Sequence, residues 1–539
     1  MESTPPAGQS PAAAPSYHTD EDERTLHRLG YAQELFRAMG GFQNFAISFT
    51  IISILAGCLT SYSIAYGQGG PVAITWGWLI VGLMSTIVAL SMAEIASSFP
   101  TAGGLYYWAS KLGSPGWGWF TGWFNLVGQI AVTASIGYGL AIFSTALMNY
   151  WFDYPNTKGY VYLTYAIVLT AALILNLSRI TVTALLNTIS AYWHMIGVGV
   201  IVLVLVLVPD DHRSFSSVFT DTLNLTGWGG DPAPTSFSSP VFWYVFLTGF
   251  LMAQYTITGF DASAHVAEET HQASRSAAVG MYMSVVASVF FGFILLVAVT
   301  AALPAEPVFD LYIVPSSWVT AMGESWGTSI LFICCVAQLF CLIASVTSAS
   351  RMLFAFSRDR AVPGHQLWRR VSSNRVPNMA VAAIVVAAAL LMLPTLYNFF
   401  IGYYVGTGIA VIGLYIAFIL PVILRFRMKD EFQPGAWTLG KHYRWIDPIA
   451  IVWVFFISIV FLMPPYSISA PWKEGFTWEA VNYAPILVGG AILLFGGWWV
   501  LSAKNWFKGP VRMGTEEELE RMEQQYERPE GAPSPAAGS

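Results

Sequence analysis

Two ionisable residues stand inside long apolar stretches and are the first candidates for chemistry. Asp261 follows Gly259 and Phe260, and His194 follows a polar run that begins at Asn187. A charged side chain at the centre of a bilayer costs at least about 2.5 kcal/mol, and an imidazole gains and loses a proton near neutral pH. These residue types indicate cation binding at Asp261 and proton binding at His194. The alternatives are a structural anchor at Asp261 and a neutral, hydrogen-bonded imidazole at His194.

The polar residues around Asp261 have a counterpart near the start of the chain. Residues 48–63 and 254–265 each combine Gly with a run of Ser and Thr inside an apolar stretch. Gly lowers the cost of unwinding a helix, and hydroxyl groups can satisfy the backbone groups that unwinding frees. Broken helices at matching positions of two halves are typical of transporters with inverted repeats, whose binding site lies at the membrane midplane. The alternative is that the small residues only let helices pack closely.

Other kinds of chemistry find little support. Cys58, Cys334, Cys335 and Cys341 lie in apolar stretches without metal-ligand spacing, so we interpret them as packing residues. The ionisable residues inside apolar stretches are few and scattered, and a nucleotide-binding Gly-x-x-x-x-Gly-Lys-Ser/Thr motif is missing from the sequence. We therefore expect no enzyme activity, metal, cofactor or nucleic-acid partner. A channel is a further alternative, although channels usually build selectivity from rings of groups on several subunits.

The composition places these residues in a membrane. Of 539 residues, 55% are hydrophobic and only 10% are charged, against about 25% charged in soluble domains. A bilayer core about 30 Å thick requires roughly 20 apolar residues per crossing helix. The sequence thus predicts an all-α integral membrane protein embedded in a lipid bilayer. Its twelve crossing helices are expected at residues 43–66, 72–97, 117–148, 160–178, 185–208, 242–267, 279–303, 327–355, 378–395, 400–424, 446–463 and 483–502.

The distribution of basic residues predicts the orientation of these helices. With the N-terminus inside, all but three of the 25 Lys and Arg residues fall on the cytoplasmic side. The exceptions are Lys158, Arg213 and Lys473. Cytoplasmic loops are enriched in Lys and Arg, so we expect a multi-pass protein of the cell membrane (plasma or inner) with both termini in the cytoplasm.

The chain is expected to divide into a membrane domain and two cytoplasmic tails. The membrane domain covers 41–505, with a first repeat at about 43–208, a second at about 242–424 and two peripheral helices at 446–502. The N-terminal tail, 1–40, is expected to be mostly disordered, and the C-terminal tail covers 506–539. Thr515 and Glu518 form a capping-box pattern that predicts a short acidic helix in the second tail.

Several short motifs resemble those of one transporter superfamily. They are Gly69-Gly70-Pro71, Ser91-Met92-Ala93-Glu94-Ile95-Ala96, Pro100-Thr101-Ala102-Gly103-Gly104-Leu105-Tyr106-Tyr107-Trp108, Gly259-Phe260-Asp261 followed by Ala267-Glu268-Glu269, and Ser348-Ala349-Ser350-Arg351 followed by Ser357-Arg358-Asp359. Over residues 30–505 the chain resembles permeases of the amino acid/polyamine/organocation (APC) superfamily. It is most similar to bacterial amino acid permeases and to the fungal and plant branch for 4-aminobutyrate, choline and a broad range of amino acids.

The resemblance implies a LeuT-like fold, with ten core helices in two inverted five-helix repeats and two additional C-terminal helices. It also implies secondary active transport of an amino acid or related small amine by alternating access, with H+ as the usual coupling ion. A permease for 4-aminobutyrate, choline, ethanolamine or a polyamine, and an amino acid exchanger, stay open as alternatives. The solute, the coupling ion and the oligomeric state do not follow from the sequence.

In that fold the two broken helices hold the solute. Amide groups at the break of the first helix suit a carboxylate, and freed carbonyl groups of the sixth helix suit an ammonium group. The resemblance implies that the substrate-binding residues at the two breaks are Ser53, Ala56, Gly57, Cys58, Thr60, Thr256, Ile257, Thr258, Gly259 and Asp261. Gln129 and Gln338 are polar residues at mid-depth that we expect to line the pathway, and the aromatic residues Phe260 and Tyr404 are expected to cap it. Family members often have Gly-Ser/Thr-Gly where this chain has Ala56-Gly57-Cys58, so the carboxylate site is expected to differ in detail.

Two further roles complete the expected site. His194 lies where several proton-coupled relatives place a Lys, which makes it the candidate for proton coupling. Replacing His194 with Ala should then abolish proton-driven accumulation and spare counterflow. Charged residues near the cytoplasmic boundary are expected to form an inner gate or scaffold, with ordinary interfacial charge as the alternative. They are Glu94, Glu268, Glu269, Arg351 and Arg358.

Overall fold

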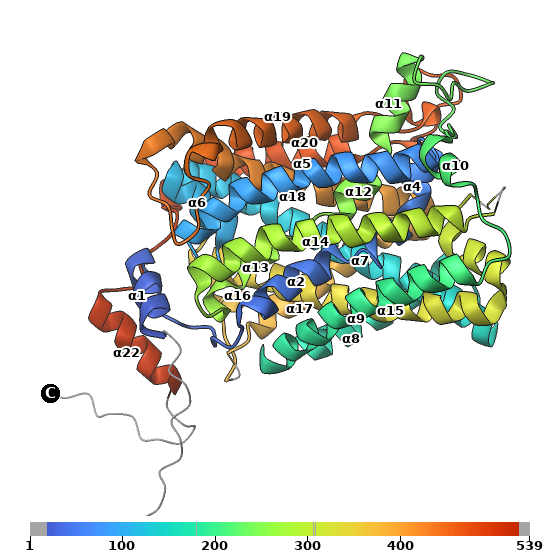
Figure 1. Ribbon diagram of the computed structural model, residues 1–539. Helices are drawn as coiled ribbons and strands as arrows, with labels where there is room; N and C mark the ends of the chain where they lie inside the picture. Colours follow the sequence, from blue (N-terminus) through green and yellow to red (C-terminus); the bar gives the residue numbers. More distant parts are fainter. Residues whose placement is uncertain (1–18, 179, 305–306, 308, 374, 528–539) are drawn as a thin grey trace, which may run out of the picture.

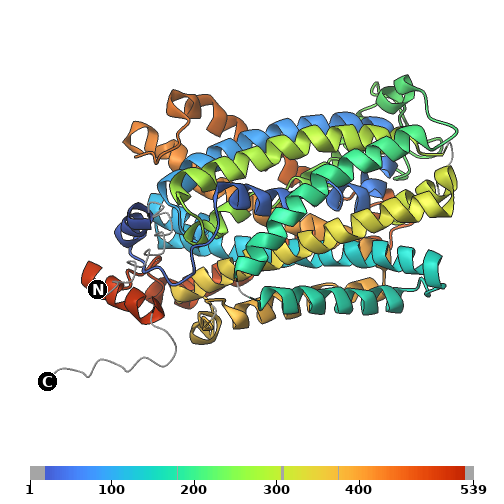
Figure 2. The ribbon, with the colours of Figure 1, turned by 60° about the horizontal axis from the view of Figure 1, so that its bottom comes forward.

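The computed structural model describes residues 19–178, 180–304, 307, 309–373 and 375–527. In this part of the chain the helices form one elongated bundle (Figure 1). Helices α1 (Thr19–Leu29) and α22 (Glu516–Glu527) lie side by side at one end, as Figures 1 and 2 both show. We call this the tail end. The opposite end, near α10 (Phe215–Thr220) and α11 (Pro240–Thr248), is called the far end.

Eleven helical segments of the described chain are long and apolar enough to cross a membrane. The long helices are α5 (Pro71–Ser98), α7 (Pro115–Phe152), α8 (Lys158–Asn176), α9 (Ile180–Leu207), α14 (Ala273–Ala301), α15 (Ile313–Arg358), α18 (Phe399–Met428) and α19 (Tyr443–Leu462). Two more are extended by short turns, α17 (Asn378–Leu391) by η2 (Leu393–Leu396) and α20 (Ala484–Trp498) by η7 (Trp499–Ala503). Helix α15 bends at Gly323, whose φ is 78°.

Two crossings are built from several short pieces. The first consists of α2 (Gly41–Ile52), α3 (Gly57–Thr60) and α4 (Tyr62–Gly67). The sixth consists of α11, α12 (Leu251–Thr256), α13 (Ala262–His265) and η1 (Ala267–Glu269). None of the sixth crossing's pieces is long enough to count as a membrane span, which is why eleven segments are found where twelve were predicted. Each predicted crossing has a helical counterpart with ends that differ by a few residues, except that α15 begins at Ile313 and not at the predicted residue 327.

Helix contacts repeat between the two halves of the bundle. Helix α5 packs along α14, α7 along α15 and α8 along α17. Within the first half α9 contacts α2, and within the second half α18 contacts α12. The first three contacts each join a helix to the helix five crossings later, and the last two are counterparts in the two halves, as expected of two related repeats. The predicted all-α fold of a membrane transporter is confirmed, whereas the exact limits of the repeats stay a prediction.

Short elements connect the long helices. They are α6 (Gly104–Leu112), α16 (His365–Trp368), α21 (Lys504–Trp506), η3 (Lys429–Glu431), η4 (Gly440–His442), η5 (Ser467–Ser469) and η6 (Trp478–Ala480). Among the described residues, β pairing is limited to an isolated parallel bridge between Met39 and Thr270. That bridge fixes the N-terminal segment to the end of the sixth crossing.

The described part of the predicted N-terminal tail is packed against the bundle, while residues 1–18 and 528–539 lie outside the described residues. Tyr31, Leu35 and Met39 are fully buried. The backbone N–H groups of residues 38 and 39 both donate to the Glu269 carbonyl oxygen, at 3.0 and 2.9 Å. At the other terminus, the Thr515 amide donates to Glu518 Oε2 at 2.8 Å, which is one half of the predicted capping box.

Candidate functional site

The first crossing is interrupted by a left-handed residue. Ser53 ends α2 with φ 31° and ψ 84°, and its carbonyl oxygen accepts hydrogen bonds from the amides of Ala56 and Gly57 at 2.8 and 3.0 Å. The Ser53 side chain lies 2.7 Å from Nε2 of His194 on α9. The break is therefore a closed turn that is tied to a neighbouring helix. Two amides predicted to bind a carboxylate are engaged inside this turn.

The sixth crossing is interrupted at Gly259, whose φ is 102°. A Cβ atom at this position would lie 2.2 Å from Cγ2 of Ile51, so both the conformation and the contact require glycine. Tyr415 Oη donates to the carbonyl oxygen of residue 257 at 3.1 Å. Ser48 Oγ donates to the carbonyl oxygen of Phe260 at 2.9 Å. Hydroxyl groups thus satisfy the backbone groups that the break frees, as expected from the sequence.

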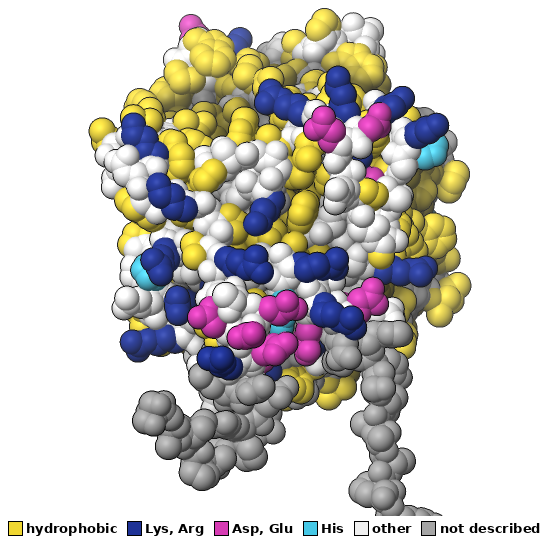
Figure 3. All heavy atoms as spheres, turned by 90° about the vertical axis from the view of Figure 1, so that its left-hand side faces the viewer, with side chains coloured by type: hydrophobic (Ala, Val, Ile, Leu, Met, Phe, Trp, Pro, Cys, Tyr) yellow, Lys and Arg dark blue, Asp and Glu magenta, His cyan; other side chains and the backbone are white. Residues whose placement is uncertain are grey.

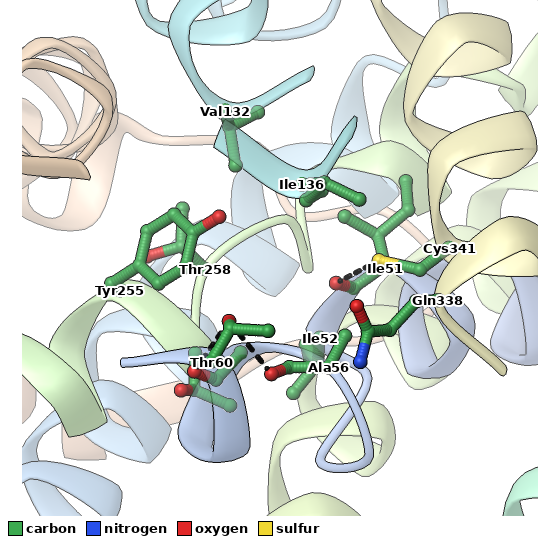
Figure 4. Close-up of a pocket in the computed structure, with 12 residues that line it drawn as sticks. Ile51, Ile52, Ala56, Thr60, Val132, Ile136, Tyr255, Thr258, Gln338 and Cys341 are labelled. Atoms are coloured by element: carbon green, nitrogen blue, oxygen red, sulfur yellow. Dashed lines mark hydrogen bonds between the residues drawn. The ribbon is translucent and has the colours of Figure 1, made fainter. Parts of the chain in front are cut away.

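The two broken helices touch each other at Gly57. A Cβ atom on this residue would lie 2.9 Å from Cα of Thr256. Beside the contact is a small buried cavity with a volume of about 10 Å³, which is room for about one water molecule. Figure 4 shows side chains of both broken helices, α7 and α15 pointing towards it. The lining residues are Ile51, Ile52, Ala56, Gly57, Thr60, Val132, Ile136, Tyr255, Thr256, Thr258, Gln338 and Cys341.

The cavity lies near the middle of the bundle and is closed in this conformation. Val132 and Ile136 occupy the centre of α7, which runs from residue 115 to 152. Every lining residue is buried. Its polar atoms belong to hydroxyl and amide side chains, including those of Thr60, Thr258 and Gln338. The lining contains no Asp, Glu, Lys, Arg or His. An ion bound in the cavity would therefore have no oppositely charged side chain beside it in the lining.

Six of the predicted substrate-binding residues line this cavity. They are Ala56, Gly57, Thr60, Thr256, Thr258 and Gln338. Gln338 also donates from Nε2 to the carbonyl oxygen of Leu55, at 3.3 Å.

The other predicted residues lie around the cavity rather than on its wall. Ile257 and Gly259 form the break, and the Phe260 ring packs 5.0 Å from that of Phe418. Cys58 Sγ donates to the carbonyl oxygen of residue 54. Tyr404 stacks edge-on against Tyr466, with 6.3 Å between ring centroids.

Sequence reasoning missed the apolar and aromatic half of the wall. Ile51, Ile52, Val132, Ile136, Tyr255 and Cys341 line the cavity and were not predicted to do so. Val132 and Ile136 are four residues apart, so they lie on one face of α7. The same spacing fits any apolar helix face, and the sequence alone does not show which face turns inwards.

His194 has the hydrogen bonds of a neutral imidazole. Its Nδ1 lies 2.8 Å from the carbonyl oxygen of Ser190, which can only accept. Its Nε2 lies 2.7 Å from the Ser53 hydroxyl, which can donate to it. The geometry fits the structural interpretation of His194, while its predicted role in proton coupling stays untested.

Asp261 points away from the cavity, into a polar cluster beside α7. Its Oδ2 accepts from Gln129 Nε2 at 2.8 Å and from Asn125 Nδ2 at 3.4 Å. The third neighbour is His265, with Nε2 at 3.3 Å from Oδ2. Gln129 therefore belongs to the Asp261 cluster and not to the cavity wall.

The tail end is closed by buried ion pairs between the end of the sixth crossing and α15. Arg351 Nε lies 2.8 Å from Glu269 Oε1. Arg358 contacts both carboxylate oxygens of Glu268, at 2.8 and 3.1 Å. The four predicted residues are thus brought together in two pairs. The arrangement can hold the tail-side half of the broken helix against α15.

Glu94, the fifth predicted gate residue, lies in a separate cluster. Its Oε2 accepts from Arg425 Nε of α18 at 2.8 Å, and its Oε1 accepts from the amide of Leu439 at 2.9 Å. It therefore anchors the loop between α18 and α19.

The N-terminal segment completes the closure at the tail end. The Arg358 guanidinium lies 3.8 Å from the centre of the Tyr31 ring. Tyr31 Oη donates to Asp359 Oδ2 at 2.8 Å. Burial, reinforced by the Asp359 charge, raises the pKa of the Tyr31 hydroxyl well above its usual value, so it stays protonated and remains a donor. Sequence analysis gave the segment no such role.

The described residues contain no group of three or more His, Cys, Asp or Glu side chains arranged to hold a metal ion.

Comparison with known proteins gives a consistent result. Residues 39–492 match the model of a family described as amino acid permease. The chain is 36% identical to amino-acid permease BAT1 of Arabidopsis thaliana, over 91% of this chain and 96% of the relative. It is 36% identical to the BAT1 homolog of rice, with the same coverage. It is 28% identical to the GABA-specific permease of Saccharomyces cerevisiae, over 91% of this chain and 86% of the relative. With the fold and the family match in agreement, the chain belongs to the amino acid permease family of the APC superfamily and is a transporter.

Proposed function

We propose that this protein is a secondary active transporter that moves an amino acid or a related small amine by alternating access, coupled to protons. The observation that carries the proposal is the closed cavity between two broken helices at the middle of the bundle. Transporters of this architecture bind their solute where such helices meet. A channel would instead need a continuous polar path, and this cavity is sealed by buried residues on all sides.

The cavity wall favours a solute without net charge. Burying an unpaired charge is costly, and the wall offers hydroxyl and amide groups but no ionised side chain. A zwitterion carries its own opposite charges and can bind through hydroxyl oxygens, the Gln338 amide and backbone groups at the breaks. We therefore place zwitterionic amino acids, including 4-aminobutyrate, ahead of choline and polyamines. The names of the relatives, amino-acid permease and GABA-specific permease, support the same classes.

Opening and closing are proposed to occur at the two ends of the bundle in turn. At the tail end, the Glu269–Arg351 and Glu268–Arg358 pairs would separate when the cavity opens to that side. At the far end, Tyr403 of α18 donates to Thr60 of α3 at 2.9 Å and would separate from it. Since all of these contacts are present together, the conformation described here is closed on both sides.

We propose that the tail end faces the cytoplasm of a cell membrane, plasma or inner. Figure 3 looks onto this end and shows many Lys and Arg side chains on it. The three basic residues expected outside make their contacts elsewhere. Lys158 donates to the carbonyl oxygen of Tyr397, and Arg213 donates to that of Leu303, just after α14. Lys473 lies over the Trp228 ring. The asymmetry is the one expected for a cytoplasmic tail end.

Uptake into proteoliposomes tests the proposed function. The purified full-length chain is reconstituted and given labelled L-alanine, L-leucine, L-glutamate, L-lysine, 4-aminobutyrate, choline, ethanolamine or putrescine. Saturable counterflow of a zwitterion, accelerated by an inward proton gradient, is expected. Flux that rises linearly with concentration would indicate a channel, and the absence of counterflow for every labelled solute would reject the proposal.

A further inference from the structure

His265 of α13 holds both of its ring nitrogens against hydrogen-bond acceptors. Nδ1 lies 3.1 Å from the carbonyl oxygen of Ala102, and Nε2 lies 3.3 Å from Oδ2 of Asp261. All three residues are fully buried. A carbonyl oxygen can only accept, so Nδ1 must carry a hydrogen. The contact with Asp261 then requires a second proton, either on Nε2 or on the carboxyl group.

We propose that the Asp261–His265 pair is the proton-binding site that couples transport to a proton gradient, an inference that rests on the proposed function. The loaded pair is an imidazolium with a carboxylate, or a neutral imidazole with a carboxylic acid, and its net charge is zero. The unloaded pair is a neutral imidazole with a carboxylate and carries one negative charge. One proton enters from water and one returns to water in each cycle, and no other bond changes.

The surroundings of Asp261 leave room for that proton. Gln129 and Asn125 both donate to Oδ2, whereas Oδ1 is buried without a hydrogen-bond partner among the described residues. A buried carboxylate oxygen without a partner is costly. A proton shared between Asp261 and His265 lowers this cost, because it removes the net charge of the pair.

The charged groups around α13 are engaged elsewhere. Glu268 and Glu269 of η1 are paired with Arg358 and Arg351 of α15. Tyr106 of α6 donates to Asp359, Lys111 of α6 lies over the Tyr107 ring and Tyr415 of α18 donates to residue 257. Helix α2 has no charged residue, and Arg275 at the start of α14 is exposed. Among the groups described around the pair, a free cation that could replace the proton is therefore lacking.

The pair is connected to the closure at the tail end through the backbone of one residue, Ala102. The amide of Ala102 donates to Glu268 Oε1 at 3.0 Å, and its carbonyl oxygen accepts from His265. Glu268 is the partner of Arg358. After loss of the proton, the Asp261 carboxylate attracts the one remaining imidazole hydrogen to Nε2, and the Nδ1 lone pair then faces the Ala102 carbonyl oxygen. The segment at Ala102 is then held less tightly, which favours opening at the tail end.

His265 has little freedom to avoid that repulsion. Gly104 has φ 47°, and a Cβ atom there would lie 3.1 Å from Cε1 of His265. The imidazole therefore packs against the backbone at the start of α6. His194 differs in this respect, because its partners Ser190 and Ser53 are uncharged and satisfy a neutral ring. A proton on His194 would add a buried charge without a carboxylate beside it.

Transport by His265→Gln and Asp261→Asn tests the inference. The assay uses labelled 4-aminobutyrate, or the labelled amino acid with the fastest wild-type counterflow, in proteoliposomes clamped at zero membrane potential. With one proton per solute, an inward gradient of about two pH units supports up to about 100-fold accumulation. The wild type and His212→Gln, a surface control, should approach this ratio. Both site variants should fall to a ratio near one, with counterflow that no longer depends on pH.

His194→Gln separates the two histidines. Because the inference assigns the proton to the Asp261–His265 pair, His194→Gln should still accumulate the solute in response to a proton gradient, even where its transport rate differs from that of the wild type. If His194→Gln loses accumulation while His265→Gln keeps it, the assignment is overturned. The assignment also fails if both site variants keep the wild-type pH dependence, or if the wild type shows counterflow without any proton dependence.

A double variant guards against loss of folding. The double variant His265→Gln, Asp261→Asn replaces the two residues with a neutral, hydrogen-bonding pair of similar size. It is used if a single variant is unstable. Acid titration of the purified proteins in detergent gives a measure that does not depend on transport. Over the pH range in which wild-type transport depends on protons, the wild type should bind one more proton per chain than the double variant, and equal proton uptake would overturn the inference. Failure of counterflow for every solute would instead reject the proposed function.

Discussion

The contact between the two broken helices makes Gly57→Ala the most direct perturbation of the site. The added Cβ would lie 2.7 Å from Oγ1, 2.9 Å from Cα and 2.9 Å from Cγ2 of Thr256. The side chain of Thr256 can rotate, but its Cα moves only with α12. Reaching an ordinary contact of about 3.5 Å requires the helices to separate by at least about 0.6 Å. Gly57 has no positive φ, so the substitution adds volume without straining the backbone.

The energetic cost can be placed within limits. Adding a methyl group to a tightly packed interior costs about 1–3 kcal/mol. If this cost falls on the closed conformation, in which the helices touch, its population relative to open conformations drops about 5- to 150-fold. Because transport passes through the closed conformation, we expect the rate of counterflow to fall by at least about fivefold.

Counterflow of labelled 4-aminobutyrate or L-alanine in proteoliposomes measures this effect, with the midpoint of thermal unfolding in detergent as a check on folding. Gly199→Ala is the matched control, because a Cβ there meets nothing within 4 Å and the residue is exposed on α9. Counterflow by Gly57→Ala within twofold of the wild type, at a normal unfolding midpoint, would refute the proposed role of the helix contact.

Two further predictions concern the charged clusters at the tail end. Glu94→Gln leaves the Arg425 guanidinium buried without its carboxylate, which should cost about 3–5 kcal/mol of stability and lower the midpoint of thermal unfolding; an unchanged midpoint would contradict the scaffold role. Arg351→Gln breaks the pair with Glu269 and should favour opening at the tail end, so that Cys341 in the cavity reacts faster with a charged thiol reagent added from that side. Cys341→Ala is the control, and a reaction rate equal to that of the wild type would count against the gate.

The features that sequence predicted well are local ones. The length of an apolar stretch determines a crossing, and Gly among hydroxyl residues at 48–63 and 254–265 marks a break. These properties belong to a few neighbouring residues, so the structure agrees with them within a few positions. The pairing of Glu268 and Glu269 with Arg358 and Arg351 was also anticipated as a group, because all four carry charge at the same membrane depth.

The features that sequence did not predict depend on distant residues or on helix rotation. Arg425 is 331 positions from Glu94, and the sequence offered no reason to prefer it over other basic residues. One residue corresponds to about 100° of rotation around a helix, so Val132, rather than its neighbours, faces the cavity for reasons that only packing decides. His265 was passed over because its partner Ala102 is 163 positions away and contributes a backbone carbonyl, which carries no sequence signature.

The motif Pro100 to Trp108 gains a physical explanation from these contacts. Ala102 joins Glu268 to His265 through its backbone N–H and C=O groups, and Gly104 lets the imidazole approach the backbone. Tyr106 donates to Asp359, at the end of the helix that carries Arg358. The motif therefore connects the proposed proton site, the tail-side half of the sixth crossing and α15. A proton bound at Asp261 and His265 can bias the tail-end closure because the same few residues belong to both.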